Sequence, residues 1–134
     1  HSDKGMVPLI EKATRNSVNV SEFIDEDRMS EVVEATKVGG ATLTGLLGTS
    51  AWYAPGAAVS ELVKAIALDS KKMFPCSALL EGEYGLSGLS IGVPCILGKN
   101  GIEEIVQVSL SDAEKAKLAD SAEGVKATNA LLNA

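Results

Sequence analysis

The chain contains a single histidine, His1, at its first position, and Asp3 follows two residues later. Histidine is the side chain best suited to accept and return a proton near neutral pH. Acid–base chemistry that needs an imidazole therefore depends on His1. The spacing of the sequence gives this histidine no partner, and a histidine at a terminus is ordinarily a tag remnant or a residue without a role.

Two pairs of glutamates are the other candidates for acid–base chemistry. Glu81 and Glu83 lie in a stretch that we expect to be extended, so they would share one face, where like charges can separate two pKa values. We prefer a solvated strand end as the interpretation of this pair. Glu103 and Glu104 follow a predicted turn, and we expect both to be exposed.

The two cysteines, Cys76 and Cys95, lack the spacing of a metal site, since no Cys-x-x-Cys motif or nearby histidine accompanies them. Buried free thiols are the interpretation that we prefer to a disulfide. The sequence also lacks Gly-x-Gly-x-x-Gly, Walker and Gly-x-Ser-x-Gly motifs. We therefore expect no metal and no cofactor bound by these residues alone.

The composition argues against two classes of partner. The chain has a net charge of -6, its 12 basic residues are scattered, and aromatic residues make up 4%. Nucleic-acid binding needs clustered Lys and Arg or stacking aromatic residues, so we predict none. No apolar run approaches the ~18 residues of a membrane span, and the first residues do not have the shape of a signal peptide. We expect a cytoplasmic protein without a membrane partner.

The elements that must position these groups change character halfway along the chain. After a short strand at 18–20, the acidic run at 25–27 favours the start of a helix, which we expect to end at Gly39 and Gly40. A shorter helix follows over 41–48, and a third over 55–69 opens near Pro55. The apolar stripe of the third helix packs either in the core or against a partner helix or second domain; it consists of Val59, Leu62, Val63 and Ile66.

The second half reads as strands followed by one long helix. Residues 72–85 are predicted to be extended, and 89–110 to form a β-hairpin with its turn at 98–101. Pro75 and Pro94 favour a strand edge or a bulge. The terminal helix spans 111–133, with a capping box at its start and close packing expected at Gly124. Residues 1–134 thus form one α+β domain, with helices packed on a twisted antiparallel sheet and a long C-terminal helix.

Four segments, in order over nearly the whole chain, resemble one known family. They read HSDKGMVPL, VGGATLTGLLGTSAWYAPGAA, FPCSALLEGEYGLSGLSIGVPCILGKNGIEEIV and LSDAEKAKLADSAEGVK. They are similar to the malate/lactate dehydrogenase family, within it to the lactate-dehydrogenase-like malate dehydrogenases, and only to the second half of that family's chain. The resemblance implies a two-domain enzyme whose NAD-binding Rossmann domain precedes this C-terminal domain and is absent from the sequence.

The resemblance also assigns roles. His1 matches the family's proton-transfer histidine, which accepts the proton of the C2 hydroxyl of malate as hydride passes to the nicotinamide and returns it to oxaloacetate in reverse. Asp3 matches the aspartate of the same motif, and the spacing from His1 to MVPL is one residue longer than the family's usual form. Ser50 and Ala51 match the wall of the substrate pocket. The aspartate that orients the histidine and the substrate-binding arginines come from the family's first half.

Three functions follow as alternatives. The first is the substrate-binding, catalytic and oligomerisation domain of an NAD-dependent malate dehydrogenase of the tricarboxylic acid cycle, a homodimer or homotetramer when intact and inactive as this fragment. The second is the same domain of a lactate or other 2-hydroxyacid dehydrogenase. The third is a non-catalytic interaction module of the same fold. In the fragment we expect His1 to be exposed and mobile.

Overall fold

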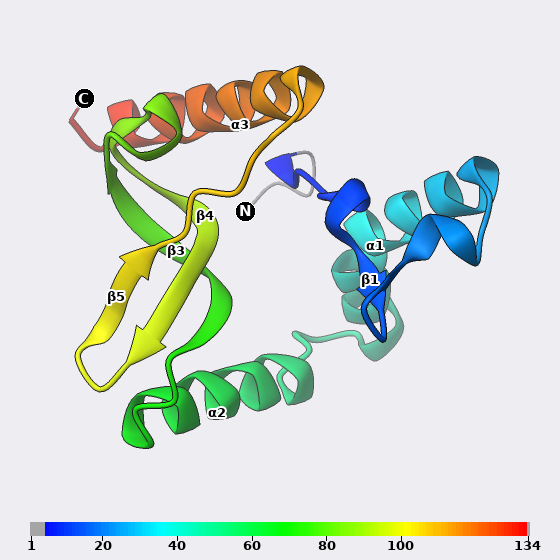
Figure 1. Ribbon diagram of the computed structural model, residues 1–134, viewed down its shortest axis with the longest axis horizontal. Helices are drawn as coiled ribbons and strands as arrows, with labels where there is room; N and C mark the ends of the chain where they lie inside the picture. The colour runs from blue at the N-terminus through cyan, green and yellow to red at the C-terminus, as the bar shows by residue number, and fades with distance from the viewer. Residues whose placement is uncertain (1–4, 134) are drawn as a thin grey trace.

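The computed structural model describes residues 5–133, in which two α-helices lie against a β-sheet and a third, the longest, lies to one side (Figure 1). The elements are, in chain order, η2 (Ile10–Lys12), β1 (Thr14–Arg15), β2 (Val18–Asn19), η3 (Val20–Glu22), α1 (Glu26–Leu47), α2 (Tyr53–Ala67), β3 (Lys72–Glu81), η4 (Glu83–Gly85), β4 (Ser87–Gly98), β5 (Gly101–Ile105), α3 (Asp112–Ala130) and η5 (Leu131–Asn133).

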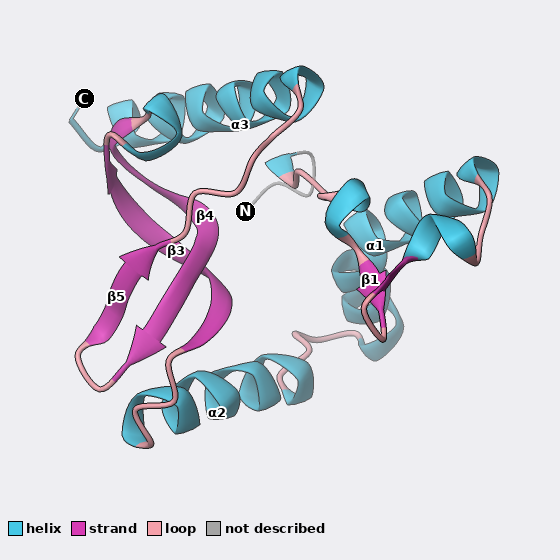
Figure 2. Cartoon of the chain, in the orientation of Figure 1, coloured by secondary structure: helices cyan, strands magenta, loops and turns pink. Residues whose placement is uncertain are grey.

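The sheet is antiparallel, with the strand order β3-β4-β5. Both α2 and α3 contact its central strand β4, and α1 lies beside β1 and β2, away from this sheet (Figure 2). The predicted α+β class and the helix-on-sheet arrangement are confirmed. No helix within residues 5–133 is both long enough and apolar enough to cross a membrane.

The core forms where the period of two along the strands turns every second side chain inward. Alternation of Ile91, Val93, Cys95 and Leu97 within the predicted hairpin indicates one inward face, and all four side chains are buried in β4, together with Leu89. Ala78 and Leu80 of β3 and Ala122 of α3 complete this layer. Cys95 is completely buried, both cysteines are free thiols as predicted, and burial raises the pKa of the Cys95 thiol.

The two strand prolines face each other, with Pro75 of β3 directly opposite Pro94 of β4. Pro75 lies on an edge strand, as predicted. The expectation of an edge or a bulge at Pro94 is wrong, because β4 is the central strand. The backbone of Pro94 faces the chain that continues from β5, and its carbonyl accepts a hydrogen bond from the Val106 N–H at 2.8 Å. A proline is tolerated here because the β4–β5 ladder ends at this point, where β5 stops at Ile105. The predicted second arm of the hairpin is therefore shorter than expected, since Val106 and Val108 lie beyond β5.

Helix α1 runs through the two glycines that were expected to stop it. A glycine ends a helix when it adopts the left-handed conformation, and here that residue is Gly48, with φ of 66° and its N–H bonded to the Thr44 carbonyl. Gly39 and Gly40 instead remain helical, so the separate helix predicted over 41–48 is part of α1. The predicted acidic start is confirmed, since the Asp25 carboxylate accepts a hydrogen bond from the Arg28 N–H at 2.8 Å.

Helix α2 begins at Tyr53, which places Pro55 in its first turn as predicted. Its apolar stripe is not packed in the core of this chain. Val59 and Val63 are 56% and 57% exposed, and Ala65 is the buried residue of the helix. Packing of this stripe in the core is therefore wrong for Val59 and Val63, and its packing against a partner helix or a second domain stays a prediction.

Helix α3 carries the predicted capping box in full. The Ser111 hydroxyl accepts from the Glu114 N–H, and the Glu114 carboxylate accepts from the Ser111 N–H at 2.7 Å. These bonds to Ser111 lower the pKa of Glu114. The prediction of close packing at Gly124 is wrong, because a Cβ built there meets nothing within 4 Å.

Candidate functional site

The proton-transfer candidate, His1, and its neighbour Asp3 lie outside the described residues, so their predicted placement stays a prediction. Ser50 and Ala51 lie in the link between α1 and α2, where Ser50 is exposed and Ala51 is half-buried. Neither residue lines the two cavities that adjoin Tyr84. The assignment of Ser50 and Ala51 to the wall of a pocket therefore stays a prediction.

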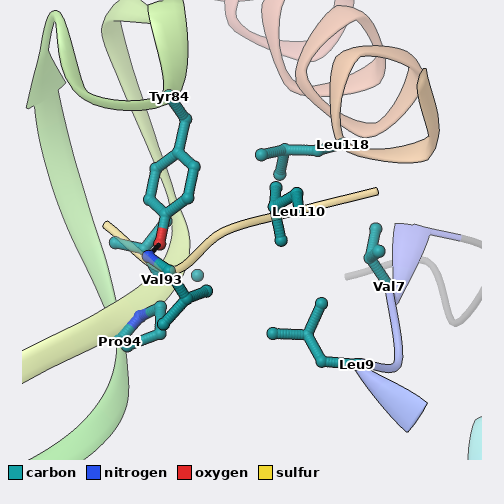
Figure 3. Close-up of a pocket in the computed structure, with 9 residues that line it drawn as sticks. Val7, Leu9, Tyr84, Val93, Pro94, Leu110 and Leu118 are labelled. Carbon is teal, nitrogen blue, oxygen red and sulfur yellow. Dashed lines mark hydrogen bonds between the residues drawn. The ribbon is translucent and has the colours of Figure 1, made fainter. Parts of the chain in front are cut away.

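The cavity nearest the start of the described chain, of about 70 Å³, is mainly aliphatic (Figure 3). Val7 and Leu9 of the N-terminal segment lie opposite Tyr84 and Pro94, and Leu118 of α3 closes one side. An aliphatic wall excludes water but carries no proton. The residues that line this cavity hold the start of the described chain, at Val7 and Leu9, beside the sheet and α3.

Tyr84 is the polar residue of this cavity, and its hydroxyl bonds the backbone beyond β5 at a point where Pro94 has no N–H to donate. Its hydroxyl donates to the Val106 carbonyl at 2.7 Å and accepts from the Val108 N–H at 3.0 Å. Pro94 has no N–H with which to reach the same carbonyl. The phenol therefore satisfies two backbone groups beyond the end of β5. Tyr84 holds this position with a φ of 55°, a conformation that is uncommon for residues other than glycine.

A second, open cavity of about 490 Å³ adjoins the first and shares Tyr84, Val108, Leu110 and Leu118 with it. Backbone and side chains of 84–86 and 107–110 line it, with Lys115 and Leu118 of α3 on the opposite side. Lys115 is its one charged lining residue, and the Lys115 ammonium is paired with Asp112 at 3.2 Å. This cavity therefore presents no acid–base pair.

Glu81 and Glu83 are not a catalytic pair in this structure. The Glu83 carboxylate accepts a hydrogen bond from the Glu81 backbone N–H at 2.7 Å, and this bond lowers the pKa of Glu83. Glu81 is exposed. Glu83 thus closes a turn at the end of β3, and a carboxylate with a lowered pKa is a poor proton donor.

Glu103 belongs to a charged cluster that joins two turns. The Lys71 ammonium lies between the carboxylates of Asp69, at 2.8 Å, and Glu103, and Asp69 also accepts from the Lys99 N–H at 2.8 Å. These contacts lower the pKa values of both carboxylates and raise that of Lys71. Gly98 sits against the cluster, and a Cβ there would lie 2.6 Å from the Lys71 nitrogen. The cluster links the end of α2 to the β4–β5 turn.

The segment after His1 is tied to α3 by one long-range hydrogen bond. The Ser121 hydroxyl donates to the Gly5 carbonyl at 3.0 Å, across 116 positions of sequence. Neither this serine nor Tyr84 was predicted as a functional residue. A serine inside a helix and a tyrosine before a strand carry no local signal of such distant partners.

The N-termini of α1 and α3 do not suit a phosphate group. A pyrophosphate binds where the N–H groups at the start of a helix are free to receive it. The first turns of α1 and α3 carry acidic side chains, Glu26 and Asp27 in one and Asp112 and Glu114 in the other. These charges repel phosphate at both helices, whereas the first turn of α2 carries no acidic residue.

Together, the antiparallel sheet order, the long capped α3 and the cavities beside Tyr84 define an α+β domain. The comparison with known families agrees: residues 1–132 match the model of the lactate/malate dehydrogenase alpha/beta C-terminal domain. The chain belongs to this family, and the resemblance stated from the sequence is confirmed.

Individual relatives point the same way. The malate dehydrogenase of Bacteroides thetaiotaomicron is 59% identical over 132 residues, which are 98% of this chain and 42% of that protein. The solved malate dehydrogenase from Salinibacter ruber superposes with a TM-score of 0.94 at 46% identity, over 96% of this chain and 42% of its own. The lactate dehydrogenase from Eimeria maxima, solved with NADH and oxamate, gives 0.89 at 34% identity, over 96% and 43%. The chain thus spans under half the length of the relatives it matches.

Proposed function

We propose that this chain is the C-terminal domain of an NAD-dependent malate dehydrogenase and supplies its proton-transfer histidine. The observation that carries the proposal is the 59% identity to a malate dehydrogenase over 98% of the chain. The sequence HSDKGMVPL adds to it, because its histidine matches the family's catalytic motif. In this proposal the N-terminal half of the protein holds NAD, which serves as the hydride acceptor.

The chemistry assigned to this chain is the proton transfer. A neutral His1 imidazole takes the proton of the C2 hydroxyl of malate, and the imidazolium returns it when oxaloacetate is reduced. Ser50 and Ala51 are assigned to the wall of the substrate pocket, which requires the other half of the protein to close over them. The intact protein is proposed to work in the cytoplasm.

The intact protein is also proposed to be a homodimer or homotetramer. The apolar side chains left uncovered on α1 and α2 support this, among them Leu46 at 81% exposure and Val63 at 57%. Faces of this kind are typical of surfaces that become buried in an assembly. Sedimentation of the full-length protein tests the assembly, and a monomer at micromolar concentration would contradict it.

The function is tested by following NADH oxidation by the full-length protein with oxaloacetate and, separately, with pyruvate. We expect turnover with oxaloacetate and a loss of about a hundredfold or more in kcat for His1→Asn, because a positioned general base contributes about that factor. A preference for pyruvate would favour the lactate dehydrogenase alternative. Activity that survives His1→Asn would contradict the assignment of His1.

Two further variants probe the parts of the proposal that concern this chain. Ala51→Leu in the full-length protein is expected to raise KM for oxaloacetate and leave KM for NADH unchanged, because only the substrate contacts the proposed wall. The 134-residue chain alone is expected to be inactive. Turnover by this chain would overturn the view that essential groups lie in the other half, and the absence of any activity in the full-length protein would favour an interaction module.

A further inference from the structure

Ser121 uses its hydroxyl differently from two threonines in the described helices. Thr36 and Thr128 each donate to the carbonyl four residues earlier in their own helix, at 2.7 and 3.0 Å, which is the usual arrangement. Ser121 instead donates out of α3 to the Gly5 carbonyl at 3.0 Å. Within residues 5–133 this is the only hydrogen bond that joins 5–8 to α3.

The helix that carries Ser121 is well fixed. Its first turn is held by the Ser111 capping box. Ala122, the next residue, is completely buried in the core, and Leu118 and Val125 pack against the same cluster one turn to either side. The Ser121 hydroxyl therefore lies on a helix that is packed against the sheet, and its hydrogen bond holds the Gly5 carbonyl to that helix.

Apolar contacts support the same attachment. Val7 and Leu9 share a small cavity with Leu118 and Tyr84, so the segment after Gly5 lies against α3 and the sheet (Figure 3). Gly5 stands four positions after His1 in the sequence. An attachment point this near limits the positions that the histidine can take, because a chain segment spans at most about 3.3–3.6 Å per residue.

We propose that Ser121 is a positioning residue for proton transfer: through the Gly5 carbonyl it fixes the point from which the segment bearing His1 departs. This inference rests on the proposed function of His1. Ser121 itself does not contact the substrate. Its loss therefore slows the chemical step without weakening cofactor binding, since misplacement of a reacting group by about an ångström is enough to lower the rate.

The test is steady-state kinetics of the full-length protein with Ser121→Ala. We expect kcat for malate oxidation to fall about fivefold, the factor that corresponds to one net hydrogen bond, with KM for NAD unchanged. The deuterium isotope effect with malate labelled at C2 should rise, because the step that breaks this C–H bond becomes more rate-limiting. Ser121→Thr keeps the hydroxyl and is expected to recover the wild-type rate.

Ser111→Ala is the matched control, because it removes a serine hydroxyl from the same helix and leaves Gly5 untouched. It should lower the melting temperature and leave kcat and the isotope effect unchanged. Equal kcat values for Ser121→Ala and wild type would overturn the positioning role, as would the same kinetic loss in Ser111→Ala. Wild-type protein without oxaloacetate reduction would overturn the proposed function, and this inference with it.

Discussion

Removal of the Tyr84 hydroxyl is expected to weaken the sheet by about 2 kcal/mol. Tyr84→Phe keeps the ring and creates no cavity, but it deletes the bonds to the Val106 carbonyl and the Val108 N–H. Each hydrogen bond contributes about 1 kcal/mol net, and more when the partner left behind is sealed from water. The adjoining open cavity lets water reach these groups, so the loss in the free energy of unfolding should stay near about 1 kcal/mol for each of the two bonds.

Urea unfolding of the chain, followed by circular dichroism, measures this loss. With a slope of about 1–3 kcal/mol/M for a small protein, the midpoint should fall by about 1 M with the slope unchanged. Tyr53→Phe is the matched control, because Tyr53 is 86% exposed and its hydroxyl should make no difference. An unchanged midpoint for Tyr84→Phe would refute the argument.

A second substitution tests why the tyrosine is needed at this position. Pro94→Ala restores a backbone N–H next to the Val106 carbonyl. The two residues already face each other, since the Val106 N–H donates to the Pro94 carbonyl at 2.8 Å. In the Pro94→Ala background, Tyr84→Phe should therefore cost less than in wild type, giving a positive coupling in the double-mutant cycle. Additive effects would show that Tyr84 does not substitute for the N–H that Pro94 lacks.

Three further predictions concern the turns and α1. Gly98→Ala should lower the urea midpoint by an amount equivalent to about 1 kcal/mol or less, because the new Cβ meets only the flexible ends of the Lys71 and Glu103 side chains, whose exposed ion pair is weak; a loss of several kcal/mol would show that the cluster is rigid. Asp69 and Glu103, with pKa values lowered from 3.8 and 4.5, contribute stability above those values and lose it as pH falls through the lowered ones. Lys71→Met should flatten this acid-side decline of the midpoint, and an unaltered pH profile would contradict the cluster's role. Gly39→Ala should stabilise α1 by about 1 kcal/mol, seen as a stronger helical signal in circular dichroism, because its Cβ meets nothing within 4 Å; a weaker signal would contradict this.

The sheet could be predicted from the sequence because its signals are local. Alternation along β4 placed Val93 and Cys95 on the buried face, and the Gly98–Gly101 turn fixed the hairpin; of its residues, Gly101 takes the positive φ, at 89°. The capping box of α3 was equally readable, since Ser111 and Glu114 are three positions apart.

The predictions that failed concern residues whose conformation or partner is decided by distant parts of the chain. Gly39 and Gly40 have the composition of a helix stop, but the left-handed residue that ends α1 is Gly48. Pro94 lies in a central strand because the Tyr84 hydroxyl, from η4, donates to the Val106 carbonyl in place of the missing N–H. The attachment of Gly5 to Ser121 spans 116 positions, and no local pattern of residues encodes a contact at that separation.

The exposure of α1 has a consequence for how the chain opens. None of the 22 residues of α1 is buried, whereas α3 and the sheet supply the buried residues of the core cluster. Amide hydrogens exchange fastest where little buried apolar surface holds an element closed. In the isolated chain, deuterium should therefore enter α1 many times faster than β4, and a protease at low concentration should cut within α1 first, releasing a C-terminal fragment that retains the sheet, its two turns and α3.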